Sequence, residues 1–335
     1  MAEAVAEDLK TQMNQLIRGY WTTQAIFVAA ELRIADLLAD GPKLPEELGR
    51  EAGVRGDMIY RLLRALASVG IFAEDDGGRF ALTPLADTLR GESGQRAYAR
   101  LHGQEFYQSW AKMLDAVRTG DAGFKLAFEM PAFEYFSKHP ERGAVFDGAM
   151  TGHHGAEADP MLDAYDFSVF RELVDVGGGN GSLLMAILKR HRGMRGVLFD
   201  LPRVVERAGP AIESAFLGDR CRIAGGSFLE SVPGGADAYL LRHVVHDWRD
   251  DDAVTMLRNC NAAMEPGGKV LIVEIVVPAG NDPSFAKWMD LMMVTYGGKE
   301  RSEKQYRELF SAAGLQLTRI VPTRAGISII EGGRD

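Results

Sequence analysis

The most constraining feature of this 335-residue sequence spans residues 173–188, where a short apolar run leads through a glycine-rich segment into a second apolar run. Its first four residues are typical of a buried strand, and residues 182–190 carry apolar side chains at helical spacing. The turn predicted between strand and helix contains Gly177, Gly179 and Gly181. A strand that turns through glycines into a helix leaves backbone N–H groups beside a ligand. We expect a ligand at this turn, although tight packing alone also explains the glycines taken by themselves.

Strand and helix patterns alternate through the rest of the carboxy-terminal half. The strand candidates are residues 172–176, 196–199, 221–224, 238–242 and 269–275. Helical stretches such as residues 202–208 and 251–263 separate them, and residues 315–322 and 328–331 are expected to form a closing strand pair. This order predicts an α/β fold with a parallel, doubly wound sheet. Ligands of such a sheet bind at the carboxyl ends of its strands.

Polar or glycine residues follow four successive strand candidates, which suits an extended nucleoside ligand. An acid at the end of the second strand, Asp200, is placed to hold ribose hydroxyls. Gly225 and Gly226 follow the third strand candidate, and their backbone together with the ring of Phe228 is suited to framing an adenine. Ser182 stands where a dinucleotide fingerprint has its last glycine, which disfavours an NAD-dependent oxidoreductase. The expected cofactor-binding residues are Asp175, Gly177, Gly179, Asp200, Leu201, Gly226, Ser227, Phe228 and Arg242.

The fourth strand is followed by two histidines, His243 and His246, three residues apart. Such a pair can ligate a metal, but no third ligand of matching spacing lies nearby, so we expect no metal site. A buried, hydrogen-bonded histidine is the plainer alternative. As a general base, His246 would be mostly neutral at its ordinary pKa of about 6.5. Glu274 ends the next strand and Glu300 begins a later helix, and a carboxylate bonded to one imidazole nitrogen raises the basicity of the other.

The amino-terminal part has the pattern of a winged helix. Residues 8–38 are helical and apolar over more than one face, typical of a core helix or of one shared with a second subunit. Short helices at residues 44–49 and 57–69 precede a hairpin formed by residues 71–74 and 79–82. From Lys43 to Arg90 there are seven basic and eight acidic residues, which disfavours a DNA-binding surface. We expect a structural or dimerising role.

Composition and length set the remaining limits. The formal charge of −9 disfavours nucleic-acid and anionic-membrane partners. Two cysteines provide no disulfide framework, the start of the chain does not resemble a signal peptide, and we expect a cytoplasmic protein. Residues 93–165 are helical and rich in aromatic and Met side chains, some of which are expected to line a pocket for a flat ligand. We divide the chain into a winged-helix domain of residues 1–95, a helical linker of residues 96–165 and a ligand-binding domain of residues 166–335.

Together these motifs resemble the S-adenosylmethionine-dependent O-methyltransferases of the plant caffeate type, whose bacterial relatives act on polyketide, phenazine and carotenoid hydroxyls. The resemblance covers nearly the whole chain, including the winged helix, which serves dimerisation in that family. It rests on the segments at residues 173–181, 199–202, 225–228, 246–248, 265–270 and 297–301, together with Glu274.

The resemblance implies S-adenosylmethionine as cofactor, a homodimer, and a Rossmann-like methyltransferase sheet beside a mostly helical winged-helix dimerisation domain. It makes His246 the catalytic base that deprotonates an acceptor hydroxyl, with Glu274 and Glu300 as the flanking acids. The family has an acid at the position of Ser227 that bonds the adenine amine, so this chain departs from the pattern there. The candidate substrate-binding residues are Met150, His153, Asp247 and Met293.

Three other functions stay open from the sequence. One is a winged-helix regulator that senses a small ligand and binds DNA. Another is an NAD-dependent oxidoreductase. The last is a relative on the same fold that methylates nitrogen or catalyses a hydroxylation. The acceptor itself is expected to be a flat, largely apolar aromatic molecule.

Overall fold

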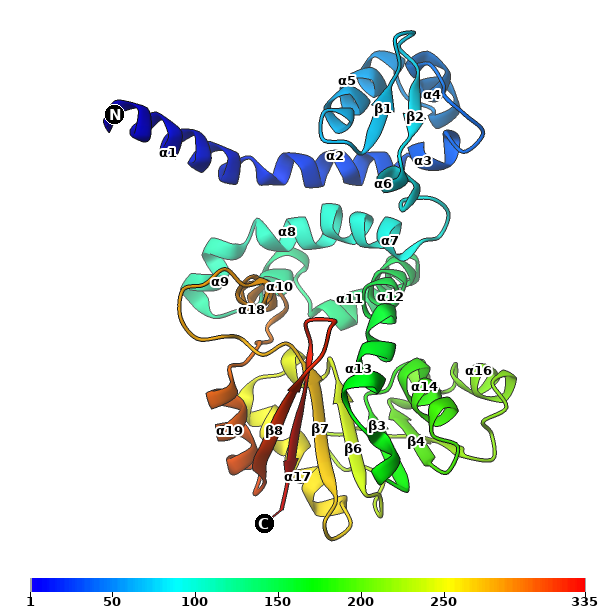
Figure 1. The fold of residues 1–335 in the computed structure, drawn as a ribbon, viewed down its shortest axis with the longest axis vertical. Coiled ribbons are helices and arrows are strands. Elements are labelled where there is room, and N and C mark those ends of the chain that lie inside the picture. Colours follow the sequence, from blue (N-terminus) through cyan, green and yellow to red (C-terminus); the bar gives the residue numbers. More distant parts are fainter. Residues whose placement is uncertain (1, 335) are drawn as a thin grey trace. The chain divides into compact units, whose positions relative to one another are not determined.

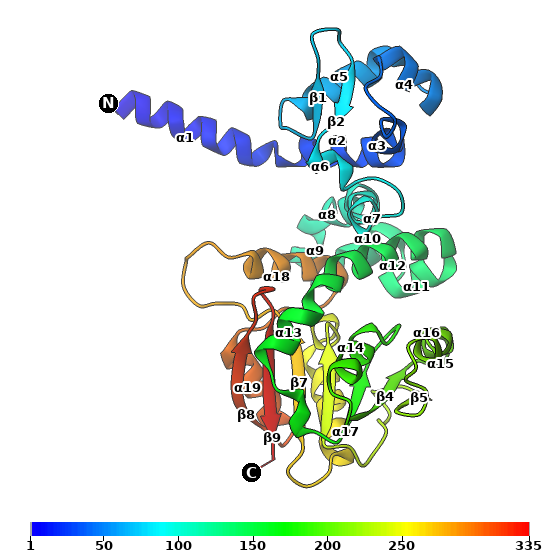
Figure 2. The same cartoon turned by 45° about the vertical axis from the view of Figure 1, so that its right-hand side comes forward.

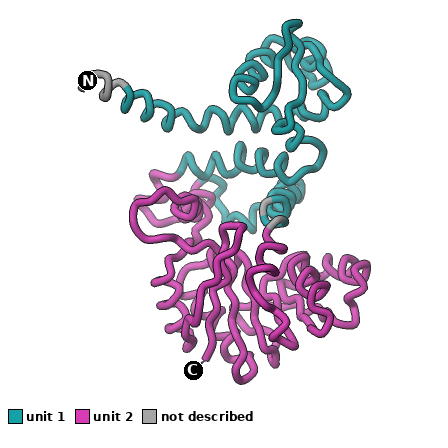
Figure 3. The backbone as a smooth tube through the Cα atoms, viewed as in Figure 1, with its two compact units in different colours: residues 1–112, 127–155 teal, residues 113–126, 156–335 magenta. Residues whose placement is uncertain are grey.

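The computed structural model describes the backbone of residues 2–334 and the side chains of residues 8–152, 154, 155 and 157–334. The chain forms two compact units, Met1–Lys112 with Ala127–Gly155, and Met113–Leu126 with Ala156–Asp335 (Figure 3). This division differs from the expected three parts, because residues 96–165 are shared between the units. Helices α7 and α12 pack together in the first unit, whereas α9 packs on α18 in the second.

The first unit begins with the helices α1 (Ala2–Ile17), α2 (Gly19–Glu31) and α3 (Ile34–Leu37). The single helical stretch expected over residues 8–38 is therefore divided. Arg33 adopts a left-handed conformation (φ 54°) between α2 and α3, which a continuous helix does not allow. The apolar side chains of α1 and early α2 that are at least half exposed are Leu9, Met13, Leu16, Ile17, Tyr20 and Trp21.

The expected helix–helix–hairpin arrangement is confirmed. It consists of α4 (Pro45–Ala52), α5 (Gly56–Ala67), β1 (Phe72–Glu74) and β2 (Phe80–Leu82), with an antiparallel strand pair. The backbones of α4 and α5 touch at two glycines, since a Cβ atom on Gly49 would lie 2.7 Å from the nitrogen of Gly56. The hairpin turn is held by Asp75, whose Oδ1 accepts the N–H groups of Gly77 and Arg79.

The other elements of the first unit are α6 (Pro84–Asp87), α7 (Gly94–Leu101), a π-helical turn (His102–Phe106), α8 (Tyr107–Trp110), α11 (Ala132–Lys138) and α12 (Pro140–His154). A charged pair lies inside this bundle. Glu105 is fully buried and accepts two hydrogen bonds from Arg142, at 2.5 Å from Nε and 2.6 Å from Nη2. This bidentate geometry compensates a carboxylate that is removed from water.

The second unit is built on a seven-stranded sheet in the order β5-β4-β3-β6-β7-β9-β8 (Figures 1 and 2). The strands are β3 (Glu172–Val176), β4 (Arg195–Asp200), β5 (Cys221–Gly225), β6 (Ala238–Arg242), β7 (Lys269–Glu274), β8 (Gln316–Pro322) and β9 (Ser328–Gly333). The expected parallel pairing holds for β3 to β7, but β9 runs antiparallel to both its neighbours, so the sheet is mixed. The closing strand pair is thus present.

Helices cover both faces of this sheet, as the doubly wound pattern predicts. Alternate strand residues enter two separate cores, with Leu173 and Leu240 on one face and Val174 and Tyr239 on the other. The first core includes α13 (Ala158–Ala164), α14 (Ser182–Arg190) and α16 (Gly209–Ser214), and the second includes α17 (Asp250–Ala263) and α19 (Glu303–Ala312). The remaining helices are α9 (Met113–Thr119), α10 (Gly123–Phe128), α15 (Pro202–Val205), α18 (Phe285–Tyr296) and the short 3₁₀ turns Gly155–Glu157, Phe167–Val169 and Val245–Asp247.

Within the described part of the chain, no helix is both long enough and apolar enough to cross a membrane.

Replacing Arg142 by Met is expected to destabilise the protein by about 3–5 kcal/mol, because it leaves the carboxylate of Glu105 buried and uncompensated. Urea unfolding followed by circular dichroism measures the loss. The matched control is Lys138→Met, which removes an exposed pair with Glu134 and is expected to cost no more than about 0.5 kcal/mol. Equal losses in the two variants contradict the structural role of the buried pair.

Candidate active site

The glycine turn after β3 has the predicted backbone. Gly177, Gly179 and Gly181 have φ angles of 71°, 59° and 75°, a conformation that other residues rarely adopt. The N–H groups of Gly177 and Gly178 both point to the carbonyl of Phe199, at 2.8 and 3.3 Å, which ties the turn to the end of β4. The turn therefore leads from the sheet into α14 at the carboxyl edge of the strands.

Asp200, the acid at the end of β4, lies across this turn as predicted. Its Oδ2 accepts the N–H of Gly179 at 3.0 Å, and its Oδ1 accepts the N–H of Leu201 at 2.6 Å. Each carboxylate oxygen has a second lone pair, so these bonds leave acceptor capacity for ribose hydroxyls. The structure thus brings Gly179, Asp200 and Leu201 together.

Asp175 lies beneath the turn and is 2% exposed. Burial raises the pKa of this carboxyl to about 7, with Arg242 acting to lower it and Asp200 to raise it. Its Oδ2 has no hydrogen-bond partner among the described residues. A buried carboxylate oxygen without a partner next to a glycine turn is suited to a donor group of a ligand.

The segment after β5 supplies the expected adenine-side residues. The N–H of Gly226 donates to the carbonyl of Asp200 at 3.0 Å, and a Cβ atom on Gly226 would lie 2.8 Å from the ring of Phe199. The ring of Phe228 packs edge-on against Trp248, with centroids 5.6 Å apart. Ser227 lies between these two residues and is half-buried. This segment therefore contacts both Asp200, at the end of β4, and Trp248, which follows the turn that carries His246.

Arg242, at the end of β6, lies beside an acid that the sequence did not single out. Its Nη1 lies 3.7 Å from Oε2 of Glu157, and the same oxygen lies 2.8 Å from Nε2 of His243. Glu157 is 7% exposed, and the backbone of His243 is left-handed with φ 53°. Glu157 precedes α13 and had no sequence signal beyond being one acid among many.

His246 lies in a 3₁₀ turn between β6 and α17. Its Nδ1 is 2.8 Å from Oε1 of Glu300, as the predicted pairing of base and acid requires. Its Nε2 is 3.6 Å from Oδ1 of Asp247, which is beyond hydrogen-bond distance. The ring is thus oriented by one carboxylate through Nδ1 and faces a second negative charge near Nε2.

Glu274 also reaches His246, but it bonds the backbone rather than the ring. Its Oε1 accepts the backbone N–H of His246 at 2.8 Å, and its Oε2 accepts the hydroxyl of Tyr306 at 2.6 Å. Glu274 and Tyr306 are both fully buried. Glu274 therefore fixes the turn that carries the base. Tyr306 was missed, because a ring at a buried helical position looks like ordinary core.

The charge state of His246 differs from the sequence expectation. Burial acts to lower the pKa of this imidazole, but Asp247, then Glu300 and Glu274, raise it to about 10. The expectation of a mostly neutral ring is therefore wrong. The ordinary value of about 6.5 applies to a solvated imidazole, whereas three carboxylates favour the charged form here.

The candidate acceptor residues are divided between the two units. Met293, on α18, is 6% exposed, and its carbonyl accepts the N–H groups of Gly297 and Gly298. Asp247 lies beside the ring of His246 in the same unit. Met150 and His153 lie on α12 in the first unit, and their part in an acceptor site stays a prediction.

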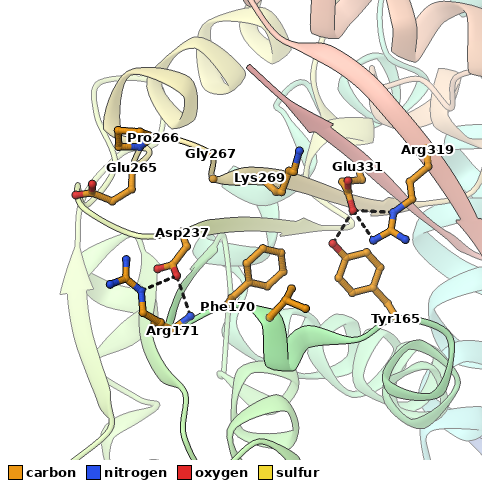
Figure 4. Close-up of a pocket in the computed structure, with 12 residues that line it drawn as sticks. Tyr165, Phe170, Arg171, Asp237, Glu265, Pro266, Gly267, Lys269, Arg319 and Glu331 are labelled. Atoms are coloured by element: carbon orange, nitrogen blue, oxygen red, sulfur yellow. Dashed lines mark hydrogen bonds and ion pairs between the residues drawn. The ribbon is translucent and has the colours of Figure 1, made fainter. Parts of the chain in front are cut away.

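A hollow of about 370 Å³ lies at the opposite edge of the sheet, near the starts of β3, β6 and β7 (Figure 4). Four of its charged lining residues form two ion pairs, Arg171 with Asp237 and Arg319 with Glu331. Ligands of doubly wound sheets bind at the carboxyl ends of the strands. The candidate active site is therefore the edge that carries Asp200 and His246, not this hollow.

Two family models match this chain. An O-methyltransferase domain covers residues 110–316, and an O-methyltransferase dimerisation domain covers residues 14–91. The phenazine O-methyltransferase PhzM of Lysobacter antibioticus is 44% identical over 331 residues, which are 98% of this chain and 97% of that protein.

Relatives with other activities are similar to this chain over nearly its whole length. The phenazine-1-carboxylate N-methyltransferase of Pseudomonas aeruginosa is 31% identical, over 92% of this chain and 92% of that protein. The aclacinomycin 10-hydroxylase RdmB of Streptomyces purpurascens is 35% identical, over 94% of this chain and 86% of that protein. Among solved structures, the neocarzinostatin O-methyltransferase NcsB1 in complex with S-adenosylmethionine and 2-hydroxy-5-methyl naphthoic acid has a TM-score of 0.84. It is 34% identical, over 94% of this chain and 96% of that one.

The family models, the relatives and the carboxyl-edge geometry agree with the resemblance seen in the sequence. The chain belongs to the S-adenosylmethionine-dependent small-molecule O-methyltransferases, and it is an S-adenosylmethionine-dependent methyltransferase that carries the family's dimerisation domain.

Proposed function

We propose that this enzyme transfers a methyl group to a phenol-type hydroxyl of an aromatic secondary metabolite, with His246 as the general base. The observation that carries the proposal is the 2.8 Å contact between Nδ1 of His246 and Glu300, which leaves Nε2 as the nitrogen that takes the acceptor proton. The solved relative that holds a hydroxynaphthoic acid and the phenazine-methylating relative support a flat aromatic acceptor.

The residues around the glycine turn fit the cofactor. Beside the turn, the carboxylate of Asp200 and the unpartnered oxygen of Asp175 would hold its ribose and amino-acid groups. Ser227 and Phe228 would frame the adenine, with a neutral hydroxyl where the family has an acid. The bound cofactor supplies a methyl group already activated by its sulfonium charge, so the protein has to position the acceptor and remove a proton.

Proton removal is the step that the His246 site performs. A phenol has a pKa of about 10 and does not ionise freely at neutral pH. The neutral ring of His246 would take the hydroxyl proton at Nε2, so that the acceptor oxygen could displace S-adenosylhomocysteine from the methyl carbon. Glu300 and Asp247 stabilise the imidazolium that results.

Before it can act, the ring must lose the proton that its acidic surroundings favour. A positive charge bound nearby lowers the pKa of an imidazole, because it disfavours a second positive charge. The bound cofactor would supply a positive charge at this edge, while Asp247, Glu300 and Glu274 are the groups of this chain that set the proton affinity of His246.

The methylation of nitrogen is a weaker candidate. An aromatic nitrogen with a free lone pair needs no base to remove a proton, so the buried pair of His246 and Glu300 favours a hydroxyl acceptor. Phenolic and amine acceptors offered together with labelled cofactor distinguish the two reactions.

The dimerisation domain and the exposed apolar side chains of α1 and α2 lead us to propose a homodimer. The activity is proposed to be cytoplasmic.

His246→Ala is expected to lower kcat by about 10²–10⁴-fold, the usual contribution of a positioned general base. The affinity for the cofactor, measured by calorimetry, is expected to stay within about twofold of the wild-type value, since the variant leaves Asp200 and the glycine turn unchanged. Turnover with labelled cofactor measures the loss, and His139→Ala, an exposed histidine, is the control. An unchanged kcat in His246→Ala removes this histidine from the mechanism.

Glu300→Gln is expected to shift the pH dependence of kcat/KM to lower pH by about 1–3 units, because the variant removes a negative charge that favours the imidazolium. In the wild type, the raised pKa of His246 makes kcat/KM rise with pH, as more of the ring becomes neutral. The profile is measured with an acceptor whose hydroxyl pKa lies outside the range studied. Glu303→Gln, an exposed acid on α19, is the control. Identical profiles argue against Glu300 as the partner of the base.

Asp200→Ala is expected to weaken cofactor binding at least about tenfold, because hydrogen bonds to a charged group are worth about 1.5–3 kcal/mol. Calorimetry with S-adenosylhomocysteine measures it, and the KM of the acceptor is expected to change much less. Asp219→Ala, on the exposed loop before β5, is the matched control. Equal affinity in wild type and Asp200→Ala contradicts the placement of the nucleoside at this edge.

A further inference from the structure

Arg301 is a fully buried arginine in the second unit, next in sequence to Glu300. A guanidinium removed from water is costly unless every N–H donor finds a partner. Arg301 makes five hydrogen bonds, as many as it has N–H groups. Such complete pairing in the interior indicates that the position of this side chain is tightly defined.

Two of these bonds bracket the catalytic turn. Nη1 donates to the carbonyl of Val245 at 3.0 Å, and Nη2 donates to the carbonyl of Trp248 at 2.9 Å. Val245 and Trp248 are the residues that immediately flank His246 and Asp247. A rigid planar group that holds both carbonyls fixes the backbone on the two sides of the base.

The charge of Arg301 is balanced at the start of α17. Oδ1 of Asp250 accepts from Nε at 3.0 Å and from Nη2 at 2.8 Å. Lys299 reaches the other oxygen of Asp250 at 2.9 Å. Burial acts to raise the pKa of Asp250, but Lys299 and Arg301 outweigh it and hold that pKa below its ordinary value. The acid therefore stays ionised and keeps the guanidinium in place.

The same short segment also carries the acid that bonds the ring. The N–H of Lys299 donates to the carbonyl of His246 at 2.7 Å, and the N–H of Glu300 donates to Oδ1 of Asp290 at 3.0 Å. Gly298 lies so close to the backbone of His246 that a Cβ atom there would overlap its carbonyl oxygen. The segment 298–301 therefore contacts the turn at its backbone and the ring through Glu300.

We propose that Arg301 is a positioning residue of the methyl transfer, which sets the distance between the imidazole of His246 and the carboxylate of Glu300. The proposal rests on the proposed role of His246 as base. Glu300 and Arg301 are adjacent, so the guanidinium that holds the turn and the carboxylate that holds the ring move as one. If the guanidinium no longer holds Val245 and Trp248, the turn shifts against Glu300 and the ring loses its orientation.

The test is Arg301→Lys, which keeps the charge but cannot reach both carbonyls and Asp250 with three donors on one atom. We expect kcat to fall about 10–100-fold, since a displacement of about 1 Å in a reacting group costs that much. The KM of the cofactor is expected to change less than about twofold. The control is Arg258→Lys on α17, whose guanidinium also binds a carbonyl, that of Ala312, away from His246. It is expected to leave kcat unchanged.

A spectroscopic readout separates positioning from stability and from the proposed chemistry. The ¹⁵N signals of His246, assigned with His246→Ala, report the titration of its ring without turnover. In Arg301→Lys we expect this titration to move toward its ordinary value by at least about 1 unit, because the contact with Glu300 is loosened. A variant that loses thermal stability but keeps both kcat and the His246 titration of the wild type overturns the proposal.

Asp250→Asn provides the second variant, and its carboxylate is half-exposed, so the fold is expected to tolerate the change. It weakens the anchor of the guanidinium, and we expect a threefold or larger fall in kcat, of the order of 1 kcal/mol, with the same direction of titration shift. If Arg301→Lys does not fold, an unchanged titration in Asp250→Asn overturns the proposal. If His246→Ala keeps full turnover, the proposed base is wrong, while a titration shift in Arg301→Lys still shows that Arg301 positions the ring.

Discussion

The contact between Glu300 and Nδ1 of His246 is the interaction on which the rest of the site depends. An imidazole can accept a proton at Nε2 only if the other nitrogen carries its hydrogen, and Glu300 ensures this by accepting that hydrogen. The hydrogen bonds to the backbone around His246 also help to hold its ring beside Glu300. Glu274 and Lys299 hold the backbone N–H and carbonyl of His246, and Arg301 holds the carbonyls on either side. His246 is therefore held in place by contacts to its main chain as well as to its ring.

This arrangement surrounds His246 with acidic side chains. Burial raises the pKa of Glu274, and the hydroxyl of Tyr306 and the backbone N–H of His246 supply hydrogen bonds that act in the other direction. Asp247 and Glu300 remain close to the ring, and the imidazolium balances them. A second cation competes with that balance and lowers the pKa of the ring. The acidic surroundings of His246 are thus suited to a positively charged ligand.

The sequence predicted the parts of the site that follow directly from strand ends. Asp200 and His246 come just after buried strands whose bounds were clear, and parallel strands place their ends at one edge. The antiparallel direction of β9 could not be predicted, because an apolar pattern carries no direction. Arg301 and Tyr306 were missed for a related reason. Their roles depend on which carbonyl or carboxylate lies opposite them in space, and the residue type alone favours a surface arginine and a core tyrosine.

Unpartnered polar atoms, rather than volume, locate the function on this sheet. In the hollow of about 370 Å³ at the starts of the strands, Glu331 already binds Tyr165 and Arg319, and Asp237 binds Arg171. At the carboxyl edge, by contrast, Asp175 and Glu300 each keep one buried oxygen without a hydrogen-bond partner among the described residues. Burying such an oxygen costs roughly 1–3 kcal/mol unless a further group supplies the missing bond. One of these oxygens lies under the glycine turn and the other beside the ring of His246, so each lies where the proposed cofactor and acceptor would supply such a group.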